Sequence, residues 1–174
     1  MPDIHKVMRG RVWKFGDSVD TSQLARGGSQ IAANENMKEN CLRALRPEFS
    51  REVRPGDLLV AGKNFGCGSS RQTAVQALQA CGIQAVLAES VARIYRRNSI
   101  ALALPTFVVP GITDLVEDGG QLEIDYAGGA VRNLTSGGEL PLARFPRSVE
   151  QIYELGGISR VIVEKLAQRG IVPE

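Results

Sequence analysis

The residues best suited to chemistry in this chain lie in one ten-residue segment, 62–71, which reads GKNFGCGSSR. Its three glycines allow the backbone to approach a ligand closely, and its two adjacent hydroxyl groups are followed directly by an arginine. A guanidinium group holds a carboxylate or a phosphate through two parallel hydrogen bonds, and free amides at a helix start attract the same anions. The segment therefore predicts an anion site that also carries a hydroxyl able to move a proton.

The spacing within this segment excludes the two common nucleotide-binding loops. A phosphate-binding loop ends in GK[ST], whereas Lys63 lies at the beginning of the segment. A dinucleotide-binding loop needs GxGxxG, which the glycines at 62, 66 and 68 do not match. A purely structural alternative stays open at this point, in which Ser69 or Ser70 caps a helix and the glycines only form the turn.

The elements around the segment predict an α/β fold. Residues 58–61 and 83–88 are short apolar runs typical of buried strands, and residues 71–81 between them have helical spacing up to Gly82. Strand, glycine-rich loop, helix and strand make a βαβ unit, whose two strands run parallel. Residues 20–36 are expected to form a long loop. Further strands are predicted at 7–15 and 105–109, helices at 37–45, 91–101, 148–155 and 158–167, and a hairpin at 121–126 and 130–134.

Composition limits the class of protein. A chain of 174 residues with 43% hydrophobic residues suits one domain spanning 1–174, and no apolar run reaches the ~18 residues of a membrane helix. The N-terminus lacks the apolar core of a signal peptide, so we expect a cytoplasmic protein. A net charge of +2 gives no general attraction to nucleic acid or membranes. Three cysteines without a CxxC pair favour neither a disulfide framework nor a self-contained metal site.

The ten-residue segment, with the AVQALQACGIQAVLAESVARIYRRNSIALALP that follows it, resembles the swivel-domain signature of the aconitase superfamily. It is most similar to the stand-alone small subunits of 3-isopropylmalate dehydratases and homoaconitases. The resemblance covers residues 8–110, with a weaker match at 154–157. It implies an aconitase-type swivel domain: a small, mostly parallel sheet with flanking helices plus a β-rich C-terminal part. In that family the domain closes over a large subunit that carries a [4Fe–4S] cluster.

The resemblance also implies roles for single residues. Ser69 matches the general base that removes the proton next to a substrate carboxylate, and Ser70 and Arg71 match the residues that hold this carboxylate. A serine hydroxyl is a poor base, so its alkoxide form needs nearby amides and cations. The residues expected to shape the loop are Asn64, Gly66, Cys67 and Gly68. The implied activity is that of a hydro-lyase subunit, active only with its large subunit, which isomerises a hydroxy acid such as 3-isopropylmalate for leucine biosynthesis.

Three positions depart from the family pattern. Gln72 replaces the glutamate that follows the arginine in many relatives, and Ser22 stands at the second acidic position of an aspartate–threonine–aspartate segment. Residues 24–31 lack the Tyr-Leu pair of the loop that contacts the variable part of the substrate. Arg26 in this loop either binds an additional carboxylate or is an exposed loop arginine. The alternatives are therefore the small subunit of a homoaconitase, or of a methylmalate or dimethylmalate dehydratase.

The resemblance further implies partners and cofactors. The expected partners are the large cluster-bearing subunit and a small di- or tricarboxylic acid, and a homo-oligomer of the isolated chain stays open. We expect no metal or cofactor on this chain, because a cluster needs three or four thiolates and Cys41 and Cys81 are interpreted as packing residues. The basic flank at 93–97 is either a solvated face or a rim toward an anion. A non-enzymatic alternative is an anion-binding regulatory module.

Overall fold

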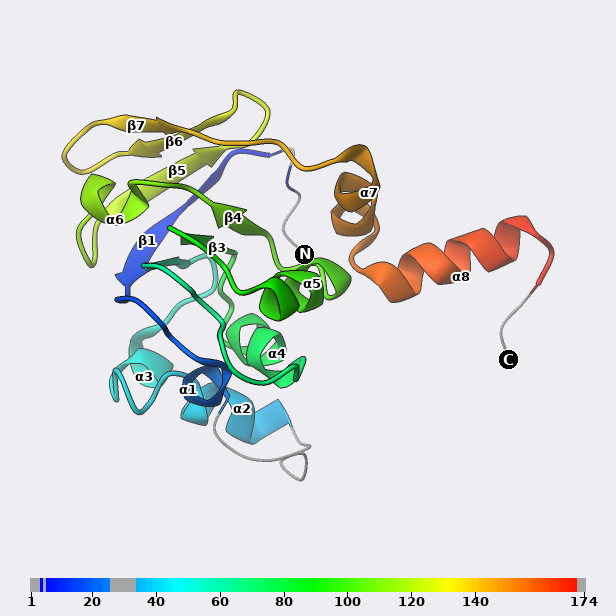
Figure 1. Ribbon diagram of the computed structural model, residues 1–174, viewed down its shortest axis with the longest axis horizontal. Coiled ribbons are helices and arrows are strands. Elements are labelled where there is room, and N and C mark those ends of the chain that lie inside the picture. Colours follow the sequence, from blue (N-terminus) through cyan, green and yellow to red (C-terminus); the bar gives the residue numbers. More distant parts are fainter. Residues whose placement is uncertain (1–3, 5, 26–33, 172–174) are drawn as a thin grey trace.

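The computed structural model describes residues 4, 6–25 and 34–171. Seven strands of this part form one sheet in the order β4-β3-β2-β1-β5-β6-β7 (Figure 1). The strands are β1 Met8–Lys14, β2 Leu58–Ala61, β3 Ala85–Ala88, β4 Thr106–Val108, β5 Gln121–Asp125, β6 Ala130–Asn133 and β7 Glu139–Pro141.

The sheet has a parallel and an antiparallel half, which share β1. Strands β1 to β4 are parallel neighbours, as the βαβ pattern predicts. The first half of β1 pairs antiparallel with β5, from Met8 opposite Ile124 onward, and its second half pairs with β2, from Val12 opposite Leu58 onward. The β-rich C-terminal part is thus continuous with the parallel core, because one strand offers hydrogen-bonding groups to both halves.

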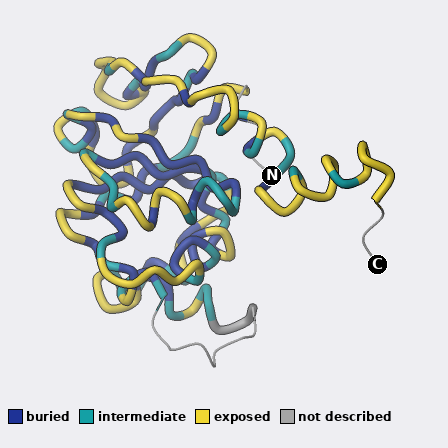
Figure 2. Tube along the Cα trace, turned by 45° about the vertical axis from the view of Figure 1, so that its right-hand side comes forward, coloured by how far each residue is buried: buried dark blue, intermediate teal, exposed yellow. Residues whose placement is uncertain are grey.

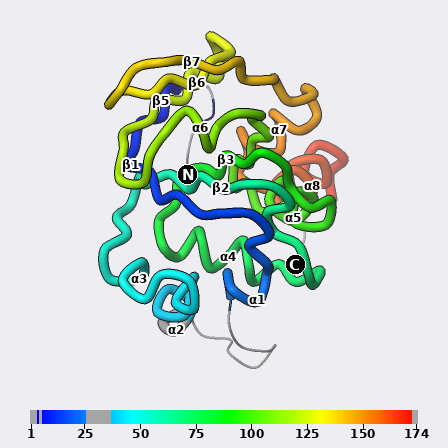
Figure 3. Tube along the Cα trace, turned by 60° about the vertical axis from the view of Figure 1, so that its left-hand side comes forward, coloured from blue at the N-terminus to red at the C-terminus, as the bar shows by residue number. Residues whose placement is uncertain are grey.

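Helices cover the sheet on both faces. They are α1 Thr21–Leu24, α2 Asn34–Asn40, α3 Phe49–Glu52, α4 Thr73–Ala80, α5 Arg93–Ala101, α6 Ile112–Leu115, α7 Arg147–Leu155 and α8 Ile158–Gln168. Helices α1 to α4 lie together on one side of the parallel strands (Figure 3). Leu59 and Ala61 pack into the core on this side, and Leu58 and Val60 into a second core on the other. Two covered faces explain why β2 is apolar at every position.

Several local predictions differ from the structure. The helix expected at 37–45 ends at Asn40, since Leu42 adopts a left-handed φ of 54°. Helix α4 begins at Thr73, two residues after the predicted start. The short elements α1, α3, α6 and β7, of three or four residues each, were not predicted, because such lengths show no hydrophobic period. Cys41 and Cys81 are buried in the core, which confirms their interpretation as packing residues.

The C-terminal helix α8 extends away from the sheet beyond α7 (Figures 1 and 2). None of its residues is buried, and Ile162 and Val163 are each 51% exposed. Across the described residues, no helix combines the length and the apolar character needed to cross a bilayer.

Candidate functional site

The glycine-rich loop, residues 62–71, leaves the carboxyl end of β2 and leads into α4. Ligands of open α/β sheets bind at this edge of the strands. Two backbone hydrogen bonds tie the loop to the segment before α1: Gly66 N donates to Val19 O, and Thr21 N donates to Cys67 O, each at 2.8 Å. The loop is therefore held against α1, although 48 residues separate Thr21 from Ser69.

The other side of the loop is anchored to α5. Phe65 is fully buried, and its ring meets the Tyr95 ring edge-on at a centroid distance of 5.1 Å. Asn98, one turn further along α5, donates from Nδ2 to the main-chain carbonyl of Ser70 at 3.0 Å. Anchors on both sides restrict the backbone around the serines, which is the condition for a preorganised site.

Left-handed backbone shapes the loop. Asn64, Gly66 and Gly68 have φ values of 58°, 74° and 102°. Asparagine tolerates this conformation better than most side chains, and glycine accepts it without a Cβ penalty. Cys67, between the two glycines, is half-buried, with Sγ 3.7 Å from the carbonyl oxygen of Ser18.

We predict that Gly66→Ala strongly destabilises the protein. A Cβ at this position would lie 2.3 Å from Cγ of the buried Tyr95, and the φ of 74° is unfavourable for alanine. Left-handed strain and overpacking together lower the free energy of unfolding by about 2–5 kcal/mol. Urea denaturation measures this loss. The matched control is Gly16→Ala, where no atom lies within 4 Å of the added Cβ. Equal midpoints for the two variants would contradict the prediction.

A cavity of about 160 Å³ lies between α1 and the glycine-rich loop, lined by Asp20, Thr21, Ser22, Ala25, Gly68, Ser69, Arg71 and Thr73. It brings together the candidate base and the candidate carboxylate clamp. Arg71 is exposed and makes no ion pair within residues 6–25 and 34–171, so its guanidinium is available to an anion. Ser70 adjoins the cavity without lining it, and Arg26 lies outside the described residues.

Neither serine caps a helix. The residue preceding α4 is Gln72, and no described side chain makes a capping hydrogen bond there. Ser69 Oγ instead lies 3.1 Å from the Thr21 hydroxyl. The structural alternative raised by the sequence, that a serine only caps α4, is therefore wrong.

Among the described residues that line the cavity, Asp20 is the one carboxylate. Its Oδ1 accepts hydrogen bonds from the Ser22 hydroxyl at 2.6 Å and from the amides of Ser22 and Gln23 at 2.7 and 3.0 Å. The Ser22 hydroxyl first, and then the amides, lower the pKa of Asp20 despite the opposing effect of partial burial. The carboxylate of Asp20 is thus ionised, and three hydrogen-bond donors already bind it. Ser22, which stands at the second acidic position of the family pattern, adds no second negative charge to the candidate anion site.

Sequence reasoning assigned no role to two residues that hold the serines in place. Thr21 contacts both the amide and the hydroxyl of Ser69, and Asn98 holds the carbonyl of Ser70. Both positions lie within segments that carry the family resemblance. Thr21 is the threonine of the aspartate–threonine–aspartate-like segment, but that pattern does not show that its side chain meets Ser69, because the contacts of both residues arise only when α1 and α5 meet the loop.

The part of the chain that the structure describes holds no cluster of metal-binding side chains. No three His, Cys, Asp or Glu side chains gather there as metal ligands. Cys41 and Cys81 face the hydrophobic core, whereas Cys67 belongs to the loop. The cysteines of this chain therefore do not fit an iron–sulfur cluster.

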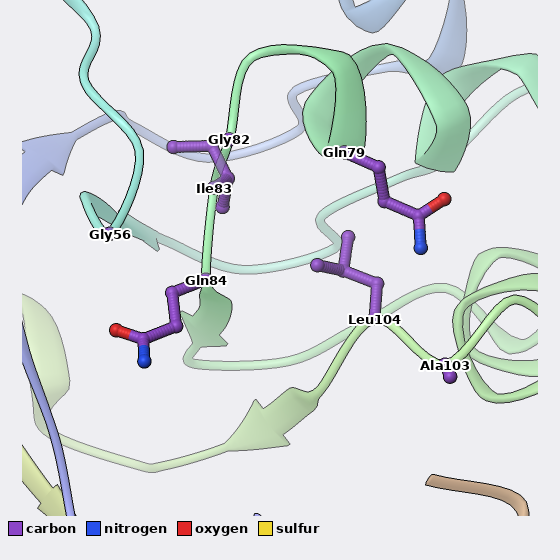
Figure 4. A pocket seen from close by; sticks show the side chains of 7 residues that line it. All are labelled: Gly56, Gln79, Gly82, Ile83, Gln84, Ala103 and Leu104. Atoms are coloured by element: carbon purple, nitrogen blue, oxygen red, sulfur yellow. The ribbon is translucent and has the colours of Figure 1, made fainter. Parts of the chain in front are cut away.

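A larger cavity, of about 410 Å³, lies at the opposite edge of the sheet, where β2, β3 and β4 begin (Figure 4). The residues around it are Gly56, Gln79, Gly82, Ile83, Gln84, Ala103 and Leu104. None of them is charged, so this cavity offers no counter-charge to a carboxylate. The smaller cavity beside Ser69 and Arg71 is the better candidate for an anionic substrate.

Comparison with known proteins gives a consistent result. Residues 22–110 match the family described as the aconitase C-terminal domain. The chain is 45% identical to the 3-isopropylmalate dehydratase small subunit 1 of Methanopyrus kandleri, over 90% of this chain and 92% of that protein. It is 42% identical to the methanogen homoaconitase small subunit of Methanothermobacter thermautotrophicus, over 87% and 88%. The crystal structure of 3-isopropylmalate dehydratase from Methanocaldococcus jannaschii matches with a TM-score of 0.87 and 33% identity, covering 95% of this chain and 99% of that one.

Proposed function

Because this chain belongs to the aconitase C-terminal domain family, among the small subunits of 3-isopropylmalate dehydratase-type hydro-lyases, we propose that it supplies the base and the carboxylate clamp for moving a hydroxyl group on 3-isopropylmalate. The reaction removes a hydrogen and a hydroxyl group, as water, from two adjacent carbons. It then adds water back so that the hydrogen and the hydroxyl group have exchanged carbons. The cavity that joins Ser69 to Arg71, which makes no ion pair within the described residues, is the observation that carries this proposal.

In this mechanism Arg71 holds a substrate carboxylate through two parallel hydrogen bonds, and Ser70 helps to hold the same group. The carboxylate then places the hydrogen on the adjacent carbon next to Ser69 Oγ. Ser69, as the alkoxide, takes this proton, and the C–H electron pair forms the carbon–carbon double bond as hydroxide departs from the adjacent carbon. The cluster assigned to the large subunit would supply the Lewis acid that accepts this hydroxide. Arg71, which lines the same cavity, is the cation that would stabilise the charged oxygen before the transfer. In the rehydration step, Ser69 returns a proton to the neighbouring carbon, which had carried the hydroxyl group. The hydroxyl group is added to the carbon that had lost its proton.

The proposal requires a second chain. A [4Fe–4S] cluster is assigned to the large subunit, as the family resemblance implies. The large subunit closes on the edge of the sheet that holds Ser69. We expect this assembly in the cytoplasm, where free thiols such as those of the three cysteines persist.

A homoaconitase-type substrate is the second candidate, supported by the 42% identity to a homoaconitase small subunit. Such an acid carries a third carboxylate, for which Arg26 is the proposed partner. Without the Tyr-Leu pair, residues 24–31 offer little apolar surface to an isopropyl group. Since one methylene contact is worth only ~1–3 kcal/mol of discrimination, methyl-substituted malates are expected to compete.

Reconstitution tests this function. The purified chain is expected to be colourless and inactive, and anaerobic addition of the cluster-loaded large subunit is expected to restore hydration of an unsaturated diacid. An assay with 3-isopropylmalate, methylmalates and a citrate homologue ranks the acids. If Arg26 binds a third carboxylate, Arg26→Ala abolishes any preference for the tricarboxylic acid. Turnover by the metal-free chain alone would overturn the proposal, and acid binding without turnover by the pair would favour the regulatory module.

A further inference from the structure

The contact between Thr21 and Ser69 consists of two interactions at one oxygen atom. The main-chain amide of Ser69 donates to Thr21 Oγ1 at 2.9 Å, and the two hydroxyl oxygens are 3.1 Å apart. Thr21 itself is only 5% exposed, whereas Ser69 is exposed. Thr21 is therefore the more deeply buried partner of the pair, although both residues line the same cavity.

The number of protons on these atoms decides the direction of the hydroxyl contact. A threonine hydroxyl has one proton and two acceptor positions, and the Ser69 amide occupies one of the acceptors. While Ser69 is a neutral hydroxyl, either oxygen can donate. Once Ser69 has lost its proton, only Thr21 can donate. A hydrogen bond to an ionised oxygen is roughly twice as strong as one between neutral groups.

We propose that Thr21 is a positioning residue for the base: its hydroxyl donates to Ser69 Oγ and stabilises the alkoxide that takes the substrate proton. During the transfer the C–H bond breaks and an O–H bond forms on Ser69. The threonine proton stays on Thr21 throughout, so Thr21 is not consumed as an acid. This inference rests on the proposed function, because it assigns Thr21 a partner only if Ser69 is the base.

The surroundings of Thr21 fix its hydroxyl in this direction. Its amide donates to Cys67 O at 2.8 Å, and the residue before it, Asp20, begins α1 with a reciprocal pair of capping bonds to Gln23. A β-branched side chain such as threonine has a restricted χ1 angle. On the loop side, a Cβ on Gly68 would lie 3.0 Å from Thr21 Oγ1. Glycine at this position therefore avoids a close contact with the threonine hydroxyl.

Variants at position 21 in the reconstituted enzyme test the proposal. Thr21→Val keeps the shape and removes the hydroxyl, and we expect kcat to fall by about 10²-fold, the effect of losing one donor to a developing oxyanion. KM is expected to stay within about twofold, since in this proposal Arg71 and Ser70 hold the substrate carboxylate and Thr21 acts only through Ser69. Thr21→Ser keeps the hydroxyl and is expected to retain kcat within a few-fold. Thr135→Val is the matched control, because its hydroxyl also accepts a main-chain amide at 2.9 Å, from Gln121 in the distant hairpin.

A double-mutant cycle separates this role from a structural one. If Thr21 acts through Ser69, Thr21→Val adds almost no loss of kcat to Ser69→Ala. Independent losses that multiply would overturn the inference, as would an unchanged kcat in Thr21→Val. Should Thr21→Val fail to fold, Thr21→Ala and Thr21→Ser are compared instead, and equal kcat values for these two would overturn it. An unchanged kcat in Ser69→Ala would instead contradict the proposed function itself.

Discussion

Replacing Ser69 by alanine is expected to lower kcat of the reconstituted enzyme by at least ~10²-fold, which is the usual contribution of a positioned general base. KM is expected to change little, because Arg71 and Ser70 still hold the carboxylate. The alanine side chain removes the oxygen that lies 3.1 Å from the Thr21 hydroxyl and leaves the backbone anchors of the loop in place. Steady-state kinetics in the direction of hydration measures both constants.

A serine elsewhere on the surface provides the control for this variant. Ser159 is exposed on α8 and does not line the cavity beside Ser69, and Ser159→Ala is expected to leave kcat and KM unchanged. Near-full activity of Ser69→Ala in the same assay would show that Ser69 is not the base. A rise in KM of Ser69→Ala with an unchanged kcat would show that Ser69 binds substrate instead of acting as the base.

Replacing Arg71 by lysine is expected to raise KM about 10- to 100-fold. Lysine keeps the charge but cannot form two parallel hydrogen bonds to one carboxylate. A hydrogen bond to a charged group contributes ~1.5–3 kcal/mol, and each ~1.4 kcal/mol is tenfold in affinity. Since no acidic side chain pairs with Arg71 in the described residues, the variant disturbs no ion pair of the folded chain.

The control for Arg71→Lys is Arg160→Lys, an exposed arginine on α8 for which no change in KM is expected. Substrate protection against urea unfolding gives an independent measure, because a weaker complex stabilises the folded enzyme less at the same acid concentration. An unchanged KM in Arg71→Lys would show that the carboxylate is held by other groups.

The family and the parallel half of the sheet follow from the sequence alone. The apolar run at 58–61 predicts a strand buried on both faces, and the glycine-rich loop after it predicts a turn into a helix at the carboxyl edge. These are short-range patterns, set by hydrophobic spacing and by the backbone freedom of glycine. The family resemblance, which the comparisons confirm, rests on the same continuous segment. The sequence predicts that Ser69 and Arg71 lie in the same site, because only one residue separates them.

Contacts between distant segments required the tertiary structure. The sequence shows Thr21 within the aspartate–threonine–aspartate-like segment, and only the approach of α1 to the loop brings its hydroxyl to Ser69, 48 residues away. The continuity of the two halves of the sheet depends likewise on β1, whose two ends pair with different strands. Hydrophobic period reports which face of an element is buried, but it carries no information on which other element covers that face. Which element covers a given face depends on packing summed over the whole chain. The contact of Thr21 with Ser69 could therefore be seen only in the folded protein.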